Sequence, residues 1–208
     1  CFLTSFLKVP LRFVNEIIDS SIEFDEKDHL LGFNNGVFDL KENIFRKYKY
    51  DDYMTTKTGY NYEEAKEEDL KTINDMIHII EPNEEKKHLL LQILSTGLIG
   101  RSFQKFVIFS GAGGNGKSWL TKLLEKALGN YFYTGKKETL TKSSSSSASP
   151  EIAQIDKKRY VKFTEPDNNE KIKNGIMKSL TGDSKFNCRM LFSNKTEIKL
   201  MATIVLEC

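Results

Sequence analysis

A glycine-rich segment between two apolar runs places the strongest constraint on what this chain can fold into. Residues 106–120 read FVIFSGAGGNGKSWL, so a short run of β-forming residues is followed by four glycines within six positions. The next residues, WLTKLLEKALG, have a helical period that ends at Gly129, a residue typical of the position just after a helix. This order predicts an α/β unit in which a glycine loop joins a buried strand to a helix.

The spacing of the glycines, the lysine and the serine predicts a phosphate-binding loop. Residues 111–118 fit the pattern G-x-x-x-x-G-K-S, in which glycines let backbone N–H groups approach phosphate oxygens. Lys117 is expected to reach the β and γ phosphates, and Ser118 to ligate Mg²⁺. ATP and Mg²⁺ are therefore the expected ligands. The candidate ATP-binding residues are Gly111, Ala112, Gly113, Gly114, Asn115, Gly116, Lys117 and Ser118.

Two other interpretations of the same loop stay open at this point. Gly111, Gly113 and Gly116 also fit G-x-G-x-x-G, the dinucleotide-binding pattern. The lysine-serine pair favours a triphosphate instead, and no acidic residue ends a second strand about 20 residues later, as the dinucleotide pattern requires. The third interpretation is a glycine turn without a ligand, which the strand before the loop and the helix after it disfavour.

A phosphate-binding loop of this kind needs a carboxylate on a neighbouring strand to serve the metal and the attacking water. The run KKRYVKFTEPD, residues 157–167, has β-forming residues that end in Glu165, and Pro166 stops the strand. Glu165 is the predicted catalytic and metal-site carboxylate, with Asp167 as the second candidate. A solvated turn residue is the plainer interpretation of either acid. Lys162 in the middle of this run is unusual for a buried central strand.

The last forty residues predict a helix followed by a hairpin. Residues 168–182 have one apolar helical face, and the runs KFNCRMLF and TEIKLMATIVLEC then have the character of two strands. The tip of such a hairpin would carry Arg189, Phe192 and Lys195. Positive charge beside an aromatic face suits single-stranded nucleic acid, but an ordinary basic surface hairpin fits the same residues equally well.

The first hundred residues predict a separate, mostly helical accessory domain. Residues 30–50 have strand-like runs around Asn35-Gly36, a hairpin signal, and indicate a small β-meander. Residues 63–81 have a helical period, and a second helix is expected from Asn83, as its N-cap, to about Ile99. The predicted division is therefore an accessory domain over 1–100 and an α/β domain over 101–208.

Composition excludes several classes of protein. The chain has 208 residues and a net charge of +2 from 31 basic and 29 acidic residues, so overall charge argues neither for nor against nucleic acid. The three cysteines are far apart, which fits a reducing compartment, and the three histidines are scattered, so no zinc site is expected. Residues 88–100 are too short and too polar to span a bilayer. An intracellular protein without a membrane segment is expected, and the ends of the chain indicate a fragment of a longer protein.

Four segments together resemble the superfamily 3 helicases, and most closely the helicase-primase ATPases of poxviruses and giant viruses. They are LLGFNNGVFDL, GAGGNGKS, SASPEIAQIDKKRYVKFTEPD and GIMKSLTGDSKFNCRMLF. The resemblance implies an AAA+-like P-loop NTPase core in which Glu165 serves metal and water. In the last segment it implies motif positions at Lys178, Thr181, Gly182, Asp183 and Arg189. The family often has T-G-G-D where this chain has TGDS, and the family's sensor asparagine would follow Cys208.

The resemblance further implies a homo-oligomeric, hexameric ring that hydrolyses ATP to move on single-stranded DNA at a viral replication site in the host cell. A primase domain would fit upstream. The expected function is therefore an ATP-dependent DNA helicase or translocase, with a P-loop small-substrate kinase or a nucleotide-binding scaffold without turnover as alternatives. The catalytic candidates are Lys117, Glu165 and Asp167; the metal candidates are Ser118 and Glu165; the DNA-binding candidates are Lys178, Arg189, Phe192 and Lys195. Because the sensor asparagine and the in-trans arginine are expected beyond Cys208, these residues alone are expected to hydrolyse almost no ATP.

Overall fold

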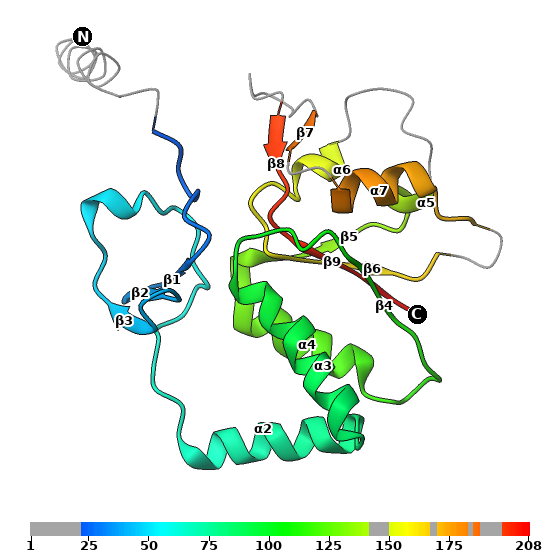
Figure 1. Ribbon diagram of the computed structural model, residues 1–208, viewed down its shortest axis with the longest axis horizontal. Helices are drawn as coiled ribbons and strands as arrows, with labels where there is room; N and C mark the ends of the chain where they lie inside the picture. Colours follow the sequence, from blue (N-terminus) through cyan, green and yellow to red (C-terminus); the bar gives the residue numbers. More distant parts are fainter. Residues whose placement is uncertain (1–21, 142–149, 167–169, 183–184, 188–196) are drawn as a thin grey trace, which may run out of the picture.

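The computed structural model describes residues 22–141, 150–166, 170–182, 185–187 and 197–208 (Figure 1). The strands are β1 (Leu30–Phe33), β2 (Gly36–Asp39), β3 (Ile44–Arg46), β4 (Phe106–Phe109), β5 (Phe132–Gly135), β6 (Tyr160–Thr164), β7 (Lys185–Asn187), β8 (Glu197–Lys199) and β9 (Thr203–Glu207). The α-helices are α2 (Glu67–Ile80), α3 (Glu84–Ser95), α4 (Lys117–Leu128), α5 (Glu138–Thr141), α6 (Pro150–Ala153) and α7 (Asn174–Gly182). Short 3₁₀ helices cover Tyr50–Asp52, Thr96–Leu98 and Gly129–Tyr131.

The central element is a four-stranded parallel sheet with the strand order β4-β9-β6-β5. Its strands are short and rich in aromatic and β-branched residues, as expected for strands that are buried in a parallel sheet. The last strand along the chain, β9, lies between β4 and β6, with Phe109 paired to Glu207 and Glu207 to Thr164. The α/β class predicted from the sequence is confirmed as a mixed α/β fold with a parallel sheet.

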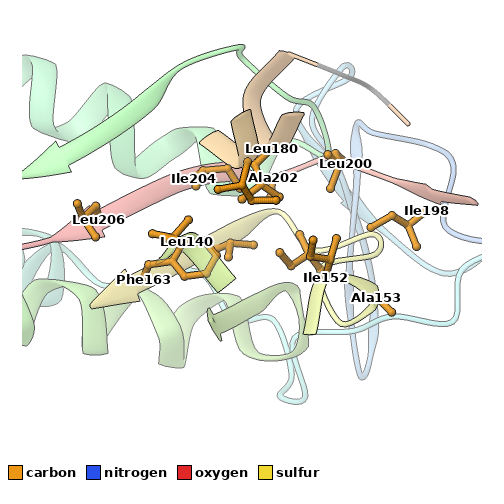
Figure 2. Packing of buried hydrophobic residues seen from close by; sticks show 13 residues of the cluster. Leu140, Ile152, Ala153, Phe163, Leu180, Ile198, Leu200, Ala202, Ile204 and Leu206 are labelled. Atoms are coloured by element: carbon orange, nitrogen blue, oxygen red, sulfur yellow. The ribbon is translucent and has the colours of Figure 1, made fainter. Parts of the chain in front are cut away.

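Alternating side chains of the sheet form two cores. On one face, Val161 and Phe163 pack with residues of α5, α6 and α7, and Figure 2 shows these side chains meeting those of β9. On the other face, Tyr160 and Val205 pack with Leu128 at the end of α4 and with residues of β1. The period of two along β6 explains why both faces are apolar. The sheet is therefore held between helices on one side and α4 with the first strands on the other.

The predicted β-meander over 30–50 is present, but its turn differs from the prediction by one residue. Strands β1, β2 and β3 pair antiparallel in that order, and Phe33 pairs with Gly36. The two-residue turn is therefore Asn34-Asn35, and not Asn35-Gly36. Gly36 lies inside a strand, where an added Cβ would lie 2.4 Å from the carbonyl oxygen of Arg46. This glycine is needed for close backbone approach, and not for a positive φ.

The two helices predicted before the glycine loop are both present. The Asn83 side chain accepts a hydrogen bond from the backbone N–H of Lys86 at 3.0 Å, so the predicted N-cap of α3 is confirmed. Along α2, Ile77 is buried whereas Leu70 is 59% exposed, so only the C-terminal half of the predicted apolar face is covered by the described residues. Within the part of the chain that the structure describes, no helix combines the length and apolar character that a bilayer crossing requires.

The second strand-like run near the end of the chain is two strands, and not one. Strand β8 pairs antiparallel with β7, whereas β9 pairs with β4 and β6 in the parallel sheet. The chain leaves strand geometry at residues 200–202, because one straight strand cannot pair in both sheets. These three residues are all buried, so the break between the strands contributes to the core.

Candidate functional site

The glycine loop lies between β4 and α4, as its sequence predicts. Gly114 and Gly116 have φ angles of 78° and 86°, in the left-handed region that favours glycine. Gly111 has a different reason to be glycine, because an added Cβ would lie 2.3 Å from the Asn115 amide nitrogen. Helix α4 begins directly after Gly116 and has no acidic residue in its first turn. The positive end of this helix therefore faces the loop without an opposing carboxylate of its own, which favours an anion there.

The ammonium group of Lys117 is held inside the loop by oxygen atoms. Its Nζ donates to the carbonyl oxygens of Gly111 at 2.6 Å and Ala112 at 3.3 Å, and to the side-chain oxygen of Asn115 at 3.0 Å. The positive charge thus sits within the curve of the backbone. Asn115 tolerates turn conformations, and its side-chain oxygen also accepts a hydrogen bond from Lys117.

Glu207, at the carboxyl end of β9, is the acidic residue that contacts the loop helix. The Ser118 hydroxyl donates to Oε1 of Glu207, and the Thr121 hydroxyl donates to Oε2 at 3.0 Å. The Lys162 ammonium lies 3.2 Å from the same Oε2. Burial alone would raise the pKa of Glu207, but the hydrogen bonds from Ser118, Thr121 and Lys162 outweigh it and leave the pKa below its usual value. The carboxylate is therefore held as an anion.

Sequence reasoning missed Glu207, although a signal for it was present. The strand TIVLE is apolar until its last residue, and a carboxylate at the end of a parallel strand lies at the edge where ligands bind in such sheets. The same argument had been applied only to Glu165. Glu207 also explains Lys162, the residue that was unusual for a buried strand, because the two side chains form an ion pair on the α4 face of the sheet.

Glu165 lies at the same edge of the sheet but faces solvent. Its backbone N–H donates to the carbonyl oxygen of Glu207 at 3.0 Å, while its side chain is exposed. Burial, and then the charge of Glu165, raise the pKa of the Cys208 thiol, whereas the charge of Lys117 acts to lower it. Cys208 therefore lies within electrostatic reach of both Glu165 and Lys117.

Ser118 and Glu165, the predicted metal residues, are both linked to Glu207. The Ser118 hydroxyl donates to the Glu207 carboxylate, and the backbone N–H of Glu165 donates to the Glu207 carbonyl oxygen. Mg²⁺ prefers oxygen ligands such as hydroxyl and carboxylate groups. The metal role of Ser118 and Glu165 stays a prediction.

Comparisons with known proteins show which proteins this chain resembles. The family described as D5 N terminal like matches residues 11–94. A protein of Acanthamoeba polyphaga mimivirus named "putative helicase" is 39% identical over 180 residues, 84% of this chain and 19% of that protein. The primase D5 of fowlpox virus is 32% identical over 215 residues, 96% of this chain and 27% of that protein. The chain is a homologue of these giant-virus and poxvirus proteins. It spans about a fifth to a quarter of their length.

A solved structure has a fold similar to that of this chain. The C-terminal region of NrS-1 superposes with a TM-score of 0.53 at 17% identity, over 66% of this chain and 33% of that one. At this identity the match speaks for the fold alone. The resemblance to the viral helicase-primase family, first suggested by four short motifs, is confirmed by sequence matches over most of the chain.

The predicted DNA-binding residues are only partly described. Lys178 lies on α7 and is exposed. The strands that frame the predicted hairpin are paired, with Phe186 opposite Ile198, so the base of the hairpin is as expected. The remaining predicted site residues fall in ranges that the structure does not describe. They are Asp167, Asp183, Arg189, Phe192 and Lys195.

Proposed function

We propose that this chain is the nucleotide-binding part of a viral replication helicase, an ATPase that moves on single-stranded DNA. The observation that carries the proposal is the loop geometry: Lys117 sits inside a loop with two left-handed glycines, and the next residue, Ser118, contacts a carboxylate on the neighbouring strand. A P-loop NTPase needs this combination of cation, hydroxyl and acid at one sheet edge. The viral homologues named helicase and primase point to the same role in DNA replication.

In this proposal the residues at this edge bind the phosphates, the metal and the attacking water. The loop backbone and Lys117 bind the phosphates of ATP, and Ser118 ligates Mg²⁺ together with Glu165. Mg²⁺, when bound, would neutralise charge on the β and γ phosphates. Glu165, which is exposed to solvent, orients the attacking water, with Asp167 as the other candidate. In a chain extended beyond Cys208, Glu165→Gln is then expected to keep nucleotide affinity and lose turnover, because the amide keeps the shape but loses the charge.

Single-stranded DNA is the proposed second ligand. Lys178 on the exposed side of α7 would neutralise a phosphate, and Arg189, Phe192 and Lys195 would do the same or stack on a base without reading the sequence. We further propose that the protein forms a homo-oligomeric, hexameric ring, that a primase domain is attached to it, and that it acts at an intracellular viral replication site. These three proposals rest on the relationship to the viral homologues.

A primase role is the second candidate, because the fowlpox homologue is named a primase. The chain would then support primer synthesis by the longer protein. A small-substrate kinase and a scaffold without turnover remain as rivals that also bind nucleotide.

The effect of bound nucleotide on the affinity for DNA distinguishes these functions without requiring turnover. The affinity for a fluorescent single-stranded oligonucleotide is measured without nucleotide, with Mg²⁺ and a slowly hydrolysed ATP analogue, and with Mg²⁺ and ADP. A translocase must bind DNA differently in its nucleotide states, so a change of at least about fivefold is expected between the ATP analogue and ADP. Equal DNA affinity in all three conditions contradicts the helicase proposal. Nucleotide-dependent extension of a ribonucleotide primer would favour the primase.

A further inference from the structure

The Glu207 side chain contacts three groups from two other elements. Its two carboxylate oxygens are divided between them: Oε1 accepts from Ser118 of α4, and Oε2 accepts from Thr121 of α4 and lies beside Lys162 of β6. The Glu207 side chain is only 9% exposed, and that of Lys162 12%. Thr121 is fully buried. This is a built site, since each of the four polar groups has a partner and only Ser118, next to the loop, is exposed.

The backbone fixes Glu207 beside the strand that leads into the glycine loop. Phe109, the last residue of β4, pairs with Glu207 in the parallel register. The next N–H, that of Cys208, donates to the Phe109 carbonyl oxygen at 2.9 Å. Because β9 lies between β4 and β6 and pairs with both, sheet hydrogen bonds fix the backbone of Glu207 beside the start of α4. Its position is therefore set by the sheet rather than by a flexible loop.

The direction of the Ser118 hydrogen bond matters for metal chemistry. A hydroxyl has one proton and two lone pairs, and a neutral serine ligates a cation through a lone pair. Its proton must then point to another acceptor. By accepting that proton, Glu207 leaves the lone pairs of Oγ free toward the loop, which is the usual role of a second group that orients a metal ligand.

The other two contacts hold the carboxylate in this orientation. Thr121 and Lys162 both occupy Oε2, so Oε1 stays directed at Ser118. Lys162 also compensates the negative charge, which would be costly in a mostly buried position without a partner. Lys162, which is unusual for a buried strand, thus holds and neutralises the Glu207 carboxylate beside the loop.

We propose that Glu207 is a positioning residue for the Mg²⁺ site: it holds the Ser118 hydroxyl so that its oxygen faces the metal. The acid that orients the loop serine then comes from β9, whereas Glu165, directly after β6, acts on the metal and the attacking water themselves. This inference rests on the proposed function, since it assumes that the loop binds Mg²⁺ with a nucleotide.

The test measures how much Mg²⁺ improves nucleotide binding. The dissociation constant of a fluorescent ATP analogue is determined for the full chain in EDTA and in saturating Mg²⁺, and the ratio of the two is the metal enhancement. Glu207→Ala is expected to lower this enhancement about tenfold to a hundredfold, because Ser118 loses the group that orients it. Affinity in EDTA is expected to stay within about twofold of the parent, since the loop backbone and Lys117 are unchanged. Glu125→Ala removes an exposed carboxylate of α4 and is expected to keep the parent enhancement.

A double-variant cycle shows whether Glu207 acts through Ser118. Ser118→Ala alone should remove the enhancement, and adding Glu207→Ala to it should cause no further loss. If the losses of enhancement in the two single variants multiply in the double variant, the proposal is overturned. It is also overturned if Glu207→Ala loses affinity equally in EDTA and in Mg²⁺. If Glu207→Ala does not fold, as judged by its thermal melt, Glu207→Gln carries the test. Its amide oxygen should face Lys162 and turn the NH₂ group toward Ser118, so the same loss of enhancement is expected.

The outcome for the parent chain separates this inference from the proposed function. A parent that binds no ATP analogue under any condition overturns the proposed function, and the Mg²⁺ role with it. A parent that binds with a clear metal enhancement, together with an unchanged enhancement in Glu207→Ala and Glu207→Gln, overturns only the role of Glu207.

Discussion

The guanidinium group of Arg159 lies 4.4 Å from the centre of the Tyr131 ring and is almost fully buried. It donates to the carbonyl oxygens of Leu98 and Leu30, so one side chain before β6 joins the end of the helical segment to the first strand. Burial lowers the pKa of this guanidinium, although the arginine stays charged in the accessible pH range. Strand β1 and the 3₁₀ helix at Thr96–Leu98 are thus joined to the start of β6 by hydrogen bonds from one long cationic side chain.

Arg159→Met is expected to destabilise the chain by about 2–4 kcal/mol, because two buried carbonyl groups lose a charged donor while the stem volume is kept. Urea denaturation followed by circular dichroism measures the free energy of unfolding. The matched control is Lys158→Met, which removes the neighbouring cation, whose ammonium donates, among the described residues, to the Asn130 carbonyl oxygen at 2.6 Å. A loss under about 1 kcal/mol is expected there. Similar losses in both variants would contradict a special role for Arg159.

A buried ion pair in the meander makes stability depend on pH. Arg46 donates to both carboxylate oxygens of Asp52 at 2.9 Å, and the Asp52 side chain is only 3% exposed. The hydrogen bond from Arg46 lowers the pKa of Asp52 below its usual 3.8, against the opposing effect of burial. Because the folded pKa is lowered, the stabilisation is complete above the unfolded pKa of 3.8 and is lost as the pH falls through the folded value.

Asp52→Asn is therefore expected to cost about 3 kcal/mol at pH 7, where the parent has the complete ion pair. The cost should shrink as the pH is lowered below about 4, because the parent carboxylate is then protonated as well. Urea denaturation at pH 7, 5, 4 and 3 measures the difference. Glu42→Gln, at an exposed position, should follow the parent at every pH. A constant difference between Asp52→Asn and the parent across this range would rule out the ion pair as its cause.

Gly36 offers a test of the close backbone approach between β2 and β3. An added Cβ would meet the Arg46 carbonyl oxygen at 2.4 Å, so Gly36→Ala is expected to destabilise the chain by about 1–3 kcal/mol. Gly175→Ala makes the same chemical change in α7, where nothing lies within 4 Å, and is expected to stabilise slightly, by about 0.5 kcal/mol. The shift in thermal midpoint of each variant gives the sign. A neutral Gly36→Ala would contradict the close approach of the Arg46 carbonyl oxygen to this position.

Local signals in the sequence predicted the elements whose shape depends on a few adjacent residues. The Asn83 cap needs only the N–H of Lys86, three residues later, and the glycine loop needs its own backbone angles. Both were therefore predictable without knowledge of the rest of the fold. The β6 strand and the helix after the loop belong to the same class, because their residue patterns match their burial.

Features that depend on distant partners were not predictable in this way. The split between β8 and β9 follows from pairing in two different sheets, which no local pattern records. Glu207 gains its importance only when β9 lies beside β4, which brings it to Ser118 across 89 positions of sequence. The turn at Asn34-Asn35 is stabilised by side chains reaching forward: Asn35 exchanges hydrogen bonds with the backbone of Tyr62. A motif search reads residues near one another in sequence and therefore misses such contacts.

Lys117→Ala is expected to weaken the binding of Mg²⁺ and ATP about tenfold to a hundredfold, because a charge-assisted contact contributes roughly 1.5–3 kcal/mol. Isothermal titration calorimetry measures the affinity. Since Lys117 is predicted to reach the β and γ phosphates, affinity for AMP should change by less than about twofold. Lys122→Ala removes an exposed lysine of the same helix and should leave both affinities unchanged. Equal ATP affinity in Lys117→Ala and the parent would contradict the phosphate-binding assignment of the loop.

The proposed DNA contact of Lys178 can be tested through salt dependence, because a phosphate contact releases counterions whereas a structural effect does not. Lys178 is exposed on α7, so its substitution by alanine removes no buried contact of the described residues. Lys178→Ala is expected to lower affinity for single strands of any sequence and to reduce the slope of log affinity against log salt by about 0.7. Lys195→Ala should do the same if it binds a second phosphate. Fluorescence anisotropy at four salt concentrations gives the slope, with Lys71→Ala on exposed α2 as the control that should match the parent. A lower affinity with an unchanged slope would mean that Lys178 affects DNA binding only indirectly and contacts no phosphate.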